Sequence, residues 1–315
     1  MPYKIHAVEI DVDSFGADSA VIIPDCTNEA LENNPQLDAA INAGEISPKH
    51  IALVAQKAMG SFSTFALPTA IDATGLKALC IATESEPGVK YYLQKHDACG
   101  SISTGSVHRS LLVSAGVVVP RRITCNHQGH ATIDYDVVIL KESANDAIVI
   151  SDTADMPTIG SDAGERWTLG PCDVGGVTLG DYTSLEIDLG NTVETRGVQS
   201  DIWDEYVEVR THSPTITLTG IDPAWFKASG GVPIDGLACT HANTLIHLRH
   251  RSSDGTGFVT DVTETHISLT AAGIATVQQP FSGQATQFTD TTITLTCLDD
   301  TSNDPIVIDT TAAIT

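Results

Sequence analysis

Apolar and polar residues alternate with a period of two in two separate stretches of the chain. Near the start, valine and isoleucine alternate with Glu9, Asp11 and Asp13. Past the middle, leucine and isoleucine alternate with Glu186 and Asp188. Because successive side chains of a strand point to opposite faces, each stretch predicts a strand with one apolar and one acidic face.

Each of these strands is followed by segments that predict a return strand and a third strand. The return strands span 50–55 and 206–211, and the third strands span 61–67 and 215–220. Thr, Val, Ile and Gly are frequent there and turn residues recur at short intervals, which is typical of many short strands. In the second half, residues 180–220 therefore predict one long β-hairpin.

Three short stretches carry helix signals. Residues 34–44 combine an N-cap asparagine, an early proline and a closing glycine. They predict a short helix that makes the first-half connection roughly 20 residues longer than its counterpart. Residues 68–79 and 222–227 follow the third strands, and each predicts a short helix across one end of its half.

The two halves of the chain resemble each other, and their matches occur in the same order. The matching segments are 115–117 with 272–274, 129–132 with 283–286, and 145–154 with 303–312. Matches that recur in the same order predict tandem duplication. We expect a mainly β fold of two tandem β-sandwich domains, residues 1–157 and 158–315, each with a short flanking helix and a long β-hairpin. A Gly- and Asp-rich linker at 158–176 would join them.

The charge of the chain excludes several kinds of partner. Its 315 residues hold 16 Lys+Arg against 40 Asp+Glu, a formal net charge of −24. A surface this negative repels nucleic acid and anionic lipid. No stretch approaches the roughly 18 consecutive apolar residues of a membrane span, and the first residues do not read as a signal peptide. Seven scattered cysteines without a CxxC pair favour a reduced chain in cytoplasm.

Histidine and cysteine come close together in the sequence at two places. These are Cys125 with His127 and His130, and His247 with His250. A metal site needs ligands that converge at fixed geometry. The first group falls in a predicted turn, and the second pair would point to opposite faces of a strand. We interpret both as ordinary histidines.

Two further patterns imitate functional sites. Residues 11–16 begin like a calcium-binding loop, but Ile22 stands where the closing glutamate belongs. Asp152 and Asp309 each precede a threonine, as in the paired aspartates of a duplicated aspartic protease. Asp309 lies six residues from the end of the sequence, which leaves no strands to build a lobe around it. We therefore expect no enzyme activity, no cofactor and no metal site.

Acidic residues on the alternating strands are the strongest functional signal. They are Glu9, Asp11, Asp13, Glu186 and Asp188, with Glu208 on the second return strand. Like charges on one face repel one another, so that face cannot be buried. It is either an ordinary solvated sheet face or a negative wall that faces a water-filled channel.

Four features occur together in both halves, and more cleanly in the second. They are the hairpin at 180–220, a third strand leading into a short helix, the acidic alternation, and the C-terminal close Asn303–Ile308 followed by Thr310–Ile314. This combination resembles the tail tube (major tail) proteins of siphophages, with the tube domain duplicated in tandem. In that family each domain is a β-sandwich with a flanking helix, and hairpins of neighbouring subunits build the inner barrel of a ring of six domains.

The resemblance implies a function for the whole molecule. A chain with two such domains is expected to form the ring from three copies, with pseudo-sixfold symmetry. The six acidic residues named above would line the lumen, through which DNA passes during ejection without specific binding. The implied partners are further copies of the chain and other tail proteins, with no membrane. The implied location is the virion tail, assembled in the host cytoplasm.

Other functions stay open at this point. The ring could belong elsewhere in the tail, such as the distal or tail-completion ring. A capsid decoration protein or adhesin would turn its acidic faces to bulk solvent or to a partner. A soluble enzyme would need a pocket with convergent titratable groups, and the sequence names none.

Overall fold

The computed structural model describes residues 3–11, 20–40, 47–48, 50–81, 88–97, 99–141, 146–160, 164–198, 201–220, 240–255, 257–282, 290–299 and 304–314. These ranges hold twenty strands and one short helix, so the fold is mainly β, as the sequence predicts. Within them, no helix is long and apolar enough to cross a membrane.

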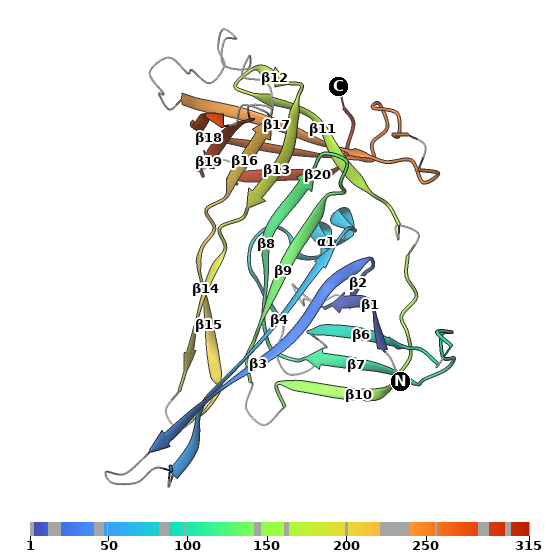
Figure 1. The fold of residues 1–315 in the computed structure, drawn as a ribbon, viewed down its shortest axis with the longest axis vertical. Coiled ribbons are helices and arrows are strands. Elements are labelled where there is room, and N and C mark those ends of the chain that lie inside the picture. The colour runs from blue at the N-terminus through green and yellow to red at the C-terminus, as the bar shows by residue number, and fades with distance from the viewer. Residues whose placement is uncertain are drawn as a thin grey trace.

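The first half of the chain forms a β-sandwich (Figure 1). Its elements are β1 (Tyr3–Ile10), β2 (Val21–Ile23), β3 (Cys26–Ala40), β4 (His50–Thr64), α1 (Leu67–Thr74), β5 (Leu79–Ile81), β6 (Val89–Lys95), β7 (His108–Val113), β8 (Gly116–Asn126), β9 (Thr132–Ile139) and β10 (Ile148–Ala154). One layer has the strand order β10-β7-β6-β1-β2, and the other contains β8-β9-β4-β3. Phe62 of β4 stacks on Tyr135 of β9 and meets Tyr91 of β6 edge-on, with ring centroids 4.7 and 6.4 Å apart. These aromatic contacts join the two layers.

The strand pairings of the second half repeat those of the first. Its elements are β11 (Trp167–Val174), β12 (Val177–Leu179), β13 (Tyr182–Asp188), β14 (Thr192–Gly197), β15 (Asp204–Thr211), β16 (Thr215–Gly220), β17 (Thr240–His250), β18 (His266–Ser282), β19 (Asp290–Cys297) and β20 (Ile306–Ala312). β11 pairs with β12 and β17 as β1 pairs with β2 and β6. β18 corresponds to β7 and β8 of the first half joined without a break. Its first part pairs with β17 and β20, and its last part pairs with β19.

Two glycines occupy equivalent, crowded positions in the halves. A Cβ atom on Gly116 would lie 2.0 Å from the carbonyl oxygen of Val138, and one on Gly273 would lie 2.1 Å from that of Thr296. Real Cβ atoms do not approach a carbonyl so closely, so each site requires glycine. The match of Ala115–Gly116 with Ala272–Gly273 in the sequence therefore reflects the same backbone contact made twice.

Two buried histidines also correspond. Nδ1 of His108, at the start of β7, accepts the backbone N–H of Lys95 at 3.0 Å. Nδ1 of His266, at the start of β18, accepts the backbone N–H of His250 at the same distance. Each ring thus satisfies a backbone donor where its neighbouring strand ends, which is the condition for burying such a group.

The helix predicted at 68–79 is present as α1, Leu67–Thr74. Pro68 stands in its first turn, where a missing N–H costs nothing. It ends earlier than predicted because Gly75 adopts a φ of +66°, a left-handed conformation that stops a helix. The hydroxyls of Thr74 and Tyr135 lie 3.0 Å apart and tie α1 to β9. The counterpart predicted at 222–227 lies outside the described residues.

The helix predicted at 34–44 is wrong for the residues that the structure describes. Residues 34–40 belong to β3, which pairs with β4 over its whole length. Pro35 is tolerated because β3 is an edge strand, which has one side without ladder partners. An isolated helix of this length is marginal in water, so the long strand pairing prevails over the local signals.

The two long hairpins correspond residue by residue, which corrects the sequence alignment of the halves. Leu37 pairs with Leu53, and Val193 pairs with Val209, so the offset is 193 − 37 = 209 − 53 = 156 residues. The same register shift occurs beside both pairs. The first connection is therefore not longer than the second. The counterpart of β1 is β11 rather than β13.

The predicted hairpin at 180–220 is present and is built in two parts. β13 pairs with β16 at its base, and β14 pairs with β15 beyond a break at 189–191. In the first hairpin, one strand, β4, contains the return strand predicted at 50–55 and residues 61–64 of the third strand predicted at 61–67, whereas Leu67 already begins α1. Figure 1 shows both hairpins running in the same direction, with β3 and β4 projecting beyond the sandwich.

Candidate functional site

The two halves share one continuous sheet. β13 pairs with β8, from Ser184 opposite Asn126 to Asp188 opposite Arg122. This junction places eight strands side by side in the order β18-β19-β16-β13-β8-β9-β4-β3, four from each half. Leu185 and Ile187 of β13 point into the common core, where both are buried. The opposite face of the eight strands is the candidate site.

This face is a field of threonines crossed by charged residues. Residues directly opposite one another on neighbouring strands share a face. One row across the sheet consists of Thr294, Thr217, Glu186, Thr124 and Thr132. The next row consists of Thr296, Thr215, Asp188, Arg122, Asp134 and Ser63. We call these two rows the polar face.

Arginines neutralise part of the acidic charge on the polar face. Nε of Arg122 lies 2.7 Å from Oδ2 of Asp134, and next to it Nε of Arg121 lies 2.6 Å from Oδ2 of Asp136. Asp134, and more weakly Glu186 and Asp188, hold the pKa of Arg122 above its ordinary value.

The net charge around the polar face is therefore small. The two ion-paired arginines, Arg121 and Arg122, carry two positive charges. The four carboxylates in and beside the two rows carry four negative charges, which gives 2 − 4 = −2; they belong to Asp134, Asp136, Glu186 and Asp188. The face is mildly acidic and has no cation left unpaired in its two rows.

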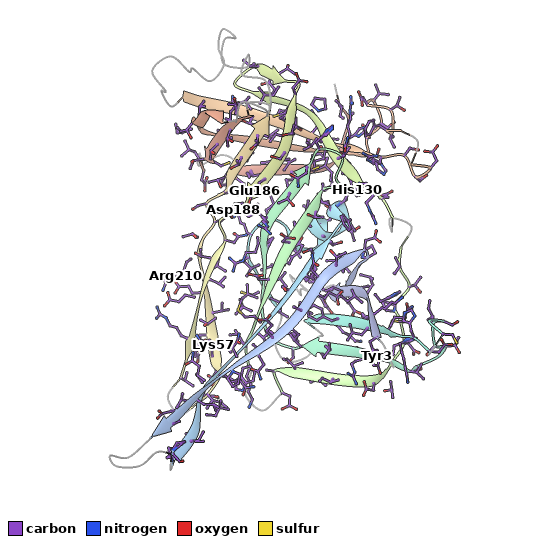
Figure 2. The ribbon with its side chains drawn as sticks, viewed as in Figure 1. Tyr3, Lys57, His130, Glu186, Asp188 and Arg210 are labelled. Carbon is purple, nitrogen blue, oxygen red and sulfur yellow. The ribbon has the colours of Figure 1, made fainter. Side chains whose placement is uncertain are left out.

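Glu186 and Asp188 lie where the sequence predicts, exposed on the acidic side of a strand whose other side is buried (Figure 2). Glu9 lies in the other layer of the first half, where Oε2 accepts the hydroxyl of Tyr92 at 2.5 Å. Asp11 is only 6% exposed, and Asp13 lies outside the described residues. β1 and β13 belong to different sheets, so Glu9 and Asp11 do not share a face with Glu186 and Asp188, and their place in a lumen stays a prediction of the resemblance.

Glu208 lies on β15, outside the two rows. It stands opposite Glu194 of β14, and Arg210 bridges the two carboxylates at 3.2 and 2.5 Å. Arg210 lowers the pKa of Glu194 below its ordinary value through a hydrogen bond and its charge. Figure 2 shows Arg210 on the hairpin, apart from Glu186 and Asp188.

The second hairpin packs across the first half of the sheet. Val193 of β14 and Val207 of β15 lie against the buried cluster of Val117, Val119 and Val138 on β8 and β9. These three valines lie on the same side of the sheet as the polar face, because Val118, Val137 and Ile139 fill the opposite, core side. The hairpin therefore covers the apolar part of this side.

Polar contacts fix the far end of the second hairpin. The backbone N–H of Gln56 donates to the carbonyl oxygen of Ile202 at 2.6 Å. Nζ of Lys57 lies 3.2 Å from Oδ2 of Asp204. A cavity of about 240 Å³ remains between the hairpin and β4, lined in part by Met59 and Val138.

Both ends of the eight-stranded sheet are open in the part of the chain that the structure describes. β3 pairs with β4 on one side and with no strand on the other. β18 pairs with β19 as far as Ser282, but its pairing with β17 stops at Ala275. Unpaired backbone groups on such edges are templates for pairing with another chain.

Sequence reasoning missed the threonine rows and the paired arginines. The signal was present in Thr-Ile-Thr-Leu-Thr, which occurs at 215–219 and again, identically, at 292–296. Strict alternation of threonine with Ile and Leu predicts a strand that is buried on one face only. The adjacent Arg121 and Arg122 gave no hint of their partners, because those lie on the next strand.

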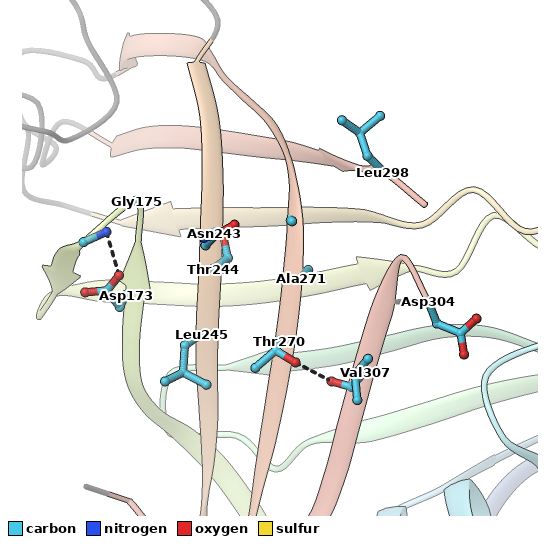
Figure 3. A pocket seen from close by; sticks show the side chains of 12 residues that line it. Asp173, Gly175, Asn243, Thr244, Leu245, Thr270, Ala271, Leu298, Asp304 and Val307 are labelled. Atoms are coloured by element: carbon cyan, nitrogen blue, oxygen red, sulfur yellow. Dashed lines mark hydrogen bonds between the residues drawn. The ribbon is translucent and has the colours of Figure 1, made fainter. Parts of the chain in front are cut away.

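A cavity of about 630 Å³ opens on the second half beside β17, β18 and β20 (Figure 3). Its two carboxylates both have partners. Oδ1 of Asp173 accepts the backbone N–H of Gly176 at 2.8 Å, and Oδ1 of Asp304 lies 2.7 Å from Nζ of Lys77. No chemistry is assigned to this pocket.

The histidine and cysteine pairs of the sequence do not form a metal cluster. Among the described residues, no three His, Cys, Asp or Glu side chains come together as ligands. Cys125 is buried in the core, whereas His127 and His130 are exposed. On β17, burial and the nearby His266 lower the pKa of both His247 and His250 below the ordinary value.

Comparison with known proteins adds no assignment. No protein-family model matches the chain, and no curated protein matches it significantly. The structure itself therefore carries the functional argument.

Proposed function

We propose that this protein forms the rings of a phage tail tube, from three copies with pseudo-sixfold symmetry, and that DNA passes through the ring during ejection. One observation carries the proposal: a single sheet crosses both halves, is polar on one face, and among the described residues ends in an open edge on each side. Such a sheet is complete only when its two edges are paired.

The junction between the halves supplies the rule for pairing the edges. Within the chain, the first residues of β8 (Gly116–Val118) pair with β5, and its last residues (Arg122–Asn126) pair with β13. The counterpart of β8 is the last part of β18, and the counterpart of β13 is the first part of β3. Those are the two open edges, so β18 of one copy would pair with β3 of the next in the same way.

Repetition of one junction generates a closed ring when the rotation closes. Three copies of eight strands give a barrel of twenty-four strands. Barrels of sixteen to eighteen strands already leave an aqueous channel, so this one would hold a wide lumen. Closure would also remove both sheet edges, which are otherwise an aggregation hazard.

The chemistry of the polar face suits a conduit for DNA. Each Lys or Arg that neutralises a phosphate adds binding free energy, and binding would slow passage. In the two rows of the polar face the only cation, Arg122, is held by Asp134. Threonine hydroxyls keep the wall hydrated, and Glu186 and Asp188 repel phosphates. In this proposal Glu208 faces a neighbouring ring or the lumen from the hairpin.

The same proposal sets the partners and the location. The chain binds further copies of itself and other tail proteins, is not an enzyme, and acts in the virion tail after assembly in the host cytoplasm.

Electron microscopy of the purified protein in negative stain tests the proposal. Rings or hollow rods of threefold or pseudo-sixfold outline are expected, with a ring mass of three chains of 33.2 kDa. A chain that stays monomeric at high concentration would contradict it. Single molecules that bind only to preformed capsids would instead indicate a decoration protein.

A further inference from the structure

The first hairpin exposes three apolar residues, and two of them, Leu37 and Ile51, have partly buried counterparts in the second hairpin. The counterpart of the third, Leu53, is Val209, which is 40% exposed. Leu37 is 64% exposed, Ile51 is 61% exposed and Leu53 is 38% exposed. Three such side chains close together on paired strands form a contiguous apolar patch. Patches of this kind mark interaction sites when they persist on a soluble surface.

The offset of 156 residues identifies the counterparts. Leu37 corresponds to Val193 and Ile51 corresponds to Val207, because the pairs Ala39–Ile51 and Thr195–Val207 also occupy equivalent places. Val193 and Val207 are partly buried, and both pack against the valine cluster of β8 and β9. The second hairpin therefore shows what covers this position when a neighbouring half is present.

The chain also contains the second-half counterpart of the valine cluster. Gly116 corresponds to Gly273 and Val138 to Thr296, so the cluster maps onto Ile274, Thr276 and Thr296 of β18 and β19. In the described structure these three side chains are not buried. They lie beside the open edge of β18, on the side of the sheet that carries the polar face. Thr296 is the end of one polar row, so a hairpin packed there would cover this end of the row.

We propose that the first hairpin of one copy packs its face of Leu37, Ile51 and Leu53 against Ile274, Thr276 and Thr296 of a second copy. The contact repeats between molecules the packing that the second hairpin makes within one molecule. It is a head-to-tail contact, since hairpin and receiving surface lie on opposite ends of the chain's own sheet. This inference rests on the proposed self-assembly and names the surface that holds it together.

A pair of aspartate variants tests the contact. Ile51 and Ile150 are both isoleucines with 61% exposure, but Ile150 lies on β10, far from the proposed interface. Ile51→Asp is expected to raise the protein concentration needed for assembly by about tenfold or more, because a charge cannot be buried unpaired there. Ile150→Asp is expected to assemble like the parent protein. Light scattering against concentration measures both.

Cysteine cross-linking gives a second readout that does not depend on the aspartate variant being folded. Leu37→Cys and Ile274→Cys are combined in a chain whose Cys80, Cys99 and Cys239 are changed to serine. Oxidation is expected to give covalent dimers and trimers and nothing longer, because the ring closes at three. The control pair Ile150→Cys with Ile274→Cys is expected to give none.

The outcomes separate this inference from the proposed function. If hollow rods form but the Leu37→Cys/Ile274→Cys pair does not cross-link, the hairpin contact is overturned and the tube stands. The same holds if Ile51→Asp assembles like the parent protein. Cross-linked dimers and trimers from a protein that forms neither rings nor hollow rods would support the contact and contradict the tube. Failure to associate at all would overturn both.

Discussion

Single residues show the correspondence between the two halves of this chain more clearly than its overall sequence does. Gly116 and Gly273 each face a carbonyl oxygen at a distance that no side chain tolerates, and His108 and His266 each accept a backbone N–H at the end of a neighbouring strand. The two glycines sit where the chain passes from one layer of its sandwich to the other, and the two histidines sit at the starts of β7 and β18. Each contact leaves little freedom for substitution at its residue.

Replacing one of these glycines is expected to destabilise the fold. Gly273→Ala would force a Cβ against the carbonyl oxygen of Thr296 and is expected to lower the free energy of unfolding by about 1–3 kcal/mol. Gly180→Ala is the control, because a Cβ there meets nothing within 4 Å. Urea denaturation measures both. Equal stability of the two variants would show that the close approach is not real.

Glu29 makes stability depend on pH. Its two carboxylate oxygens are buried and have no hydrogen-bond partner among the described residues, and burial raises its pKa to about 8. The folded protein therefore keeps a proton that the unfolded chain loses near its ordinary pKa of 4.5. By linkage, stability falls as the pH rises from about 4.5 to about 8 and changes little above that.

The variant Glu29→Gln is expected to remove this dependence, because an amide does not ionise. Near pH 5 its melting temperature should stay close to that of the parent, and at pH 8.5 it should be higher. Thermal unfolding followed by circular dichroism at both pH values is the measurement. If the difference in melting temperature between variant and parent were the same at pH 5 and at pH 8.5, the burial of this carboxyl group would be contradicted.

At the scale of elements, the two halves differ in how their long hairpins pack. Both have the same pairs and the same register shift, but the second bends at Gly190–Asn191 and lies across β8 and β9. Nδ2 of Asn191 donates to the carbonyl oxygens of Leu76 and Pro120 at 2.8 Å each, which holds the bend against the first half. The first hairpin has no such partner within the described chain and keeps its apolar side exposed.

The packing of the second hairpin can be tested within the monomer. Val207→Asp would place a charge against the valine cluster and is expected to cost about 1–3 kcal/mol of unfolding free energy. Val262→Asp serves as the control, since Val262 is 80% exposed. Denaturant unfolding of both variants gives the comparison. If the two variants were equally stable, the hairpin would not be packed on the sheet in solution.

Elements with a long, regular hydrophobic pattern could be predicted from the sequence. The strands with which they pair could not. The alternation at 185–189 and 215–220 predicted the right strands, and the segment that begins at Pro68 predicted the one helix among the described residues. The helix at 34–44 failed because asparagine, proline and glycine also suit an edge strand. Glu9 and Asp11 were grouped with Glu186 because both strands alternate, whereas the layer of a strand is set by its distant partners.

At the scale of the whole molecule, charge and shape act together. The chain carries −24, yet the polar face has a net charge of only about −2, because arginines pair with half of its carboxylates. The wall thus repels phosphate weakly and offers it no unpaired cation. The proposed conduit depends on this balance rather than on a dense ring of acids.

Reversing two charges should turn the wall into a DNA-binding surface. Changing Glu186 and Asp188 to lysine shifts the charge around the polar face from −2 to +2, and both side chains are exposed, so folding should be preserved. Assembled particles are expected to bind DNA with an affinity that falls as salt increases. Co-sedimentation with DNA measures this.

The matched control changes Asp155 and Glu264 to lysine. These two exposed residues lie on loops outside the polar face, so the control makes the same change in total charge elsewhere. Equal DNA binding by both double variants would show that total charge, rather than the lumen, decides binding. An unfolded Glu186/Asp188 variant would show that these side chains are structural.

The continuity of the sheet from copy to copy is the central claim, and a cryo-electron microscopy reconstruction of the assembled protein tests it most directly. We predict three chains per ring, with β3 of each copy beside the last part of β18 of the next and Glu186 and Asp188 facing the bore. A reconstruction in which β3 pairs with β3 of another copy, or in which both edges stay open to solvent, would contradict it.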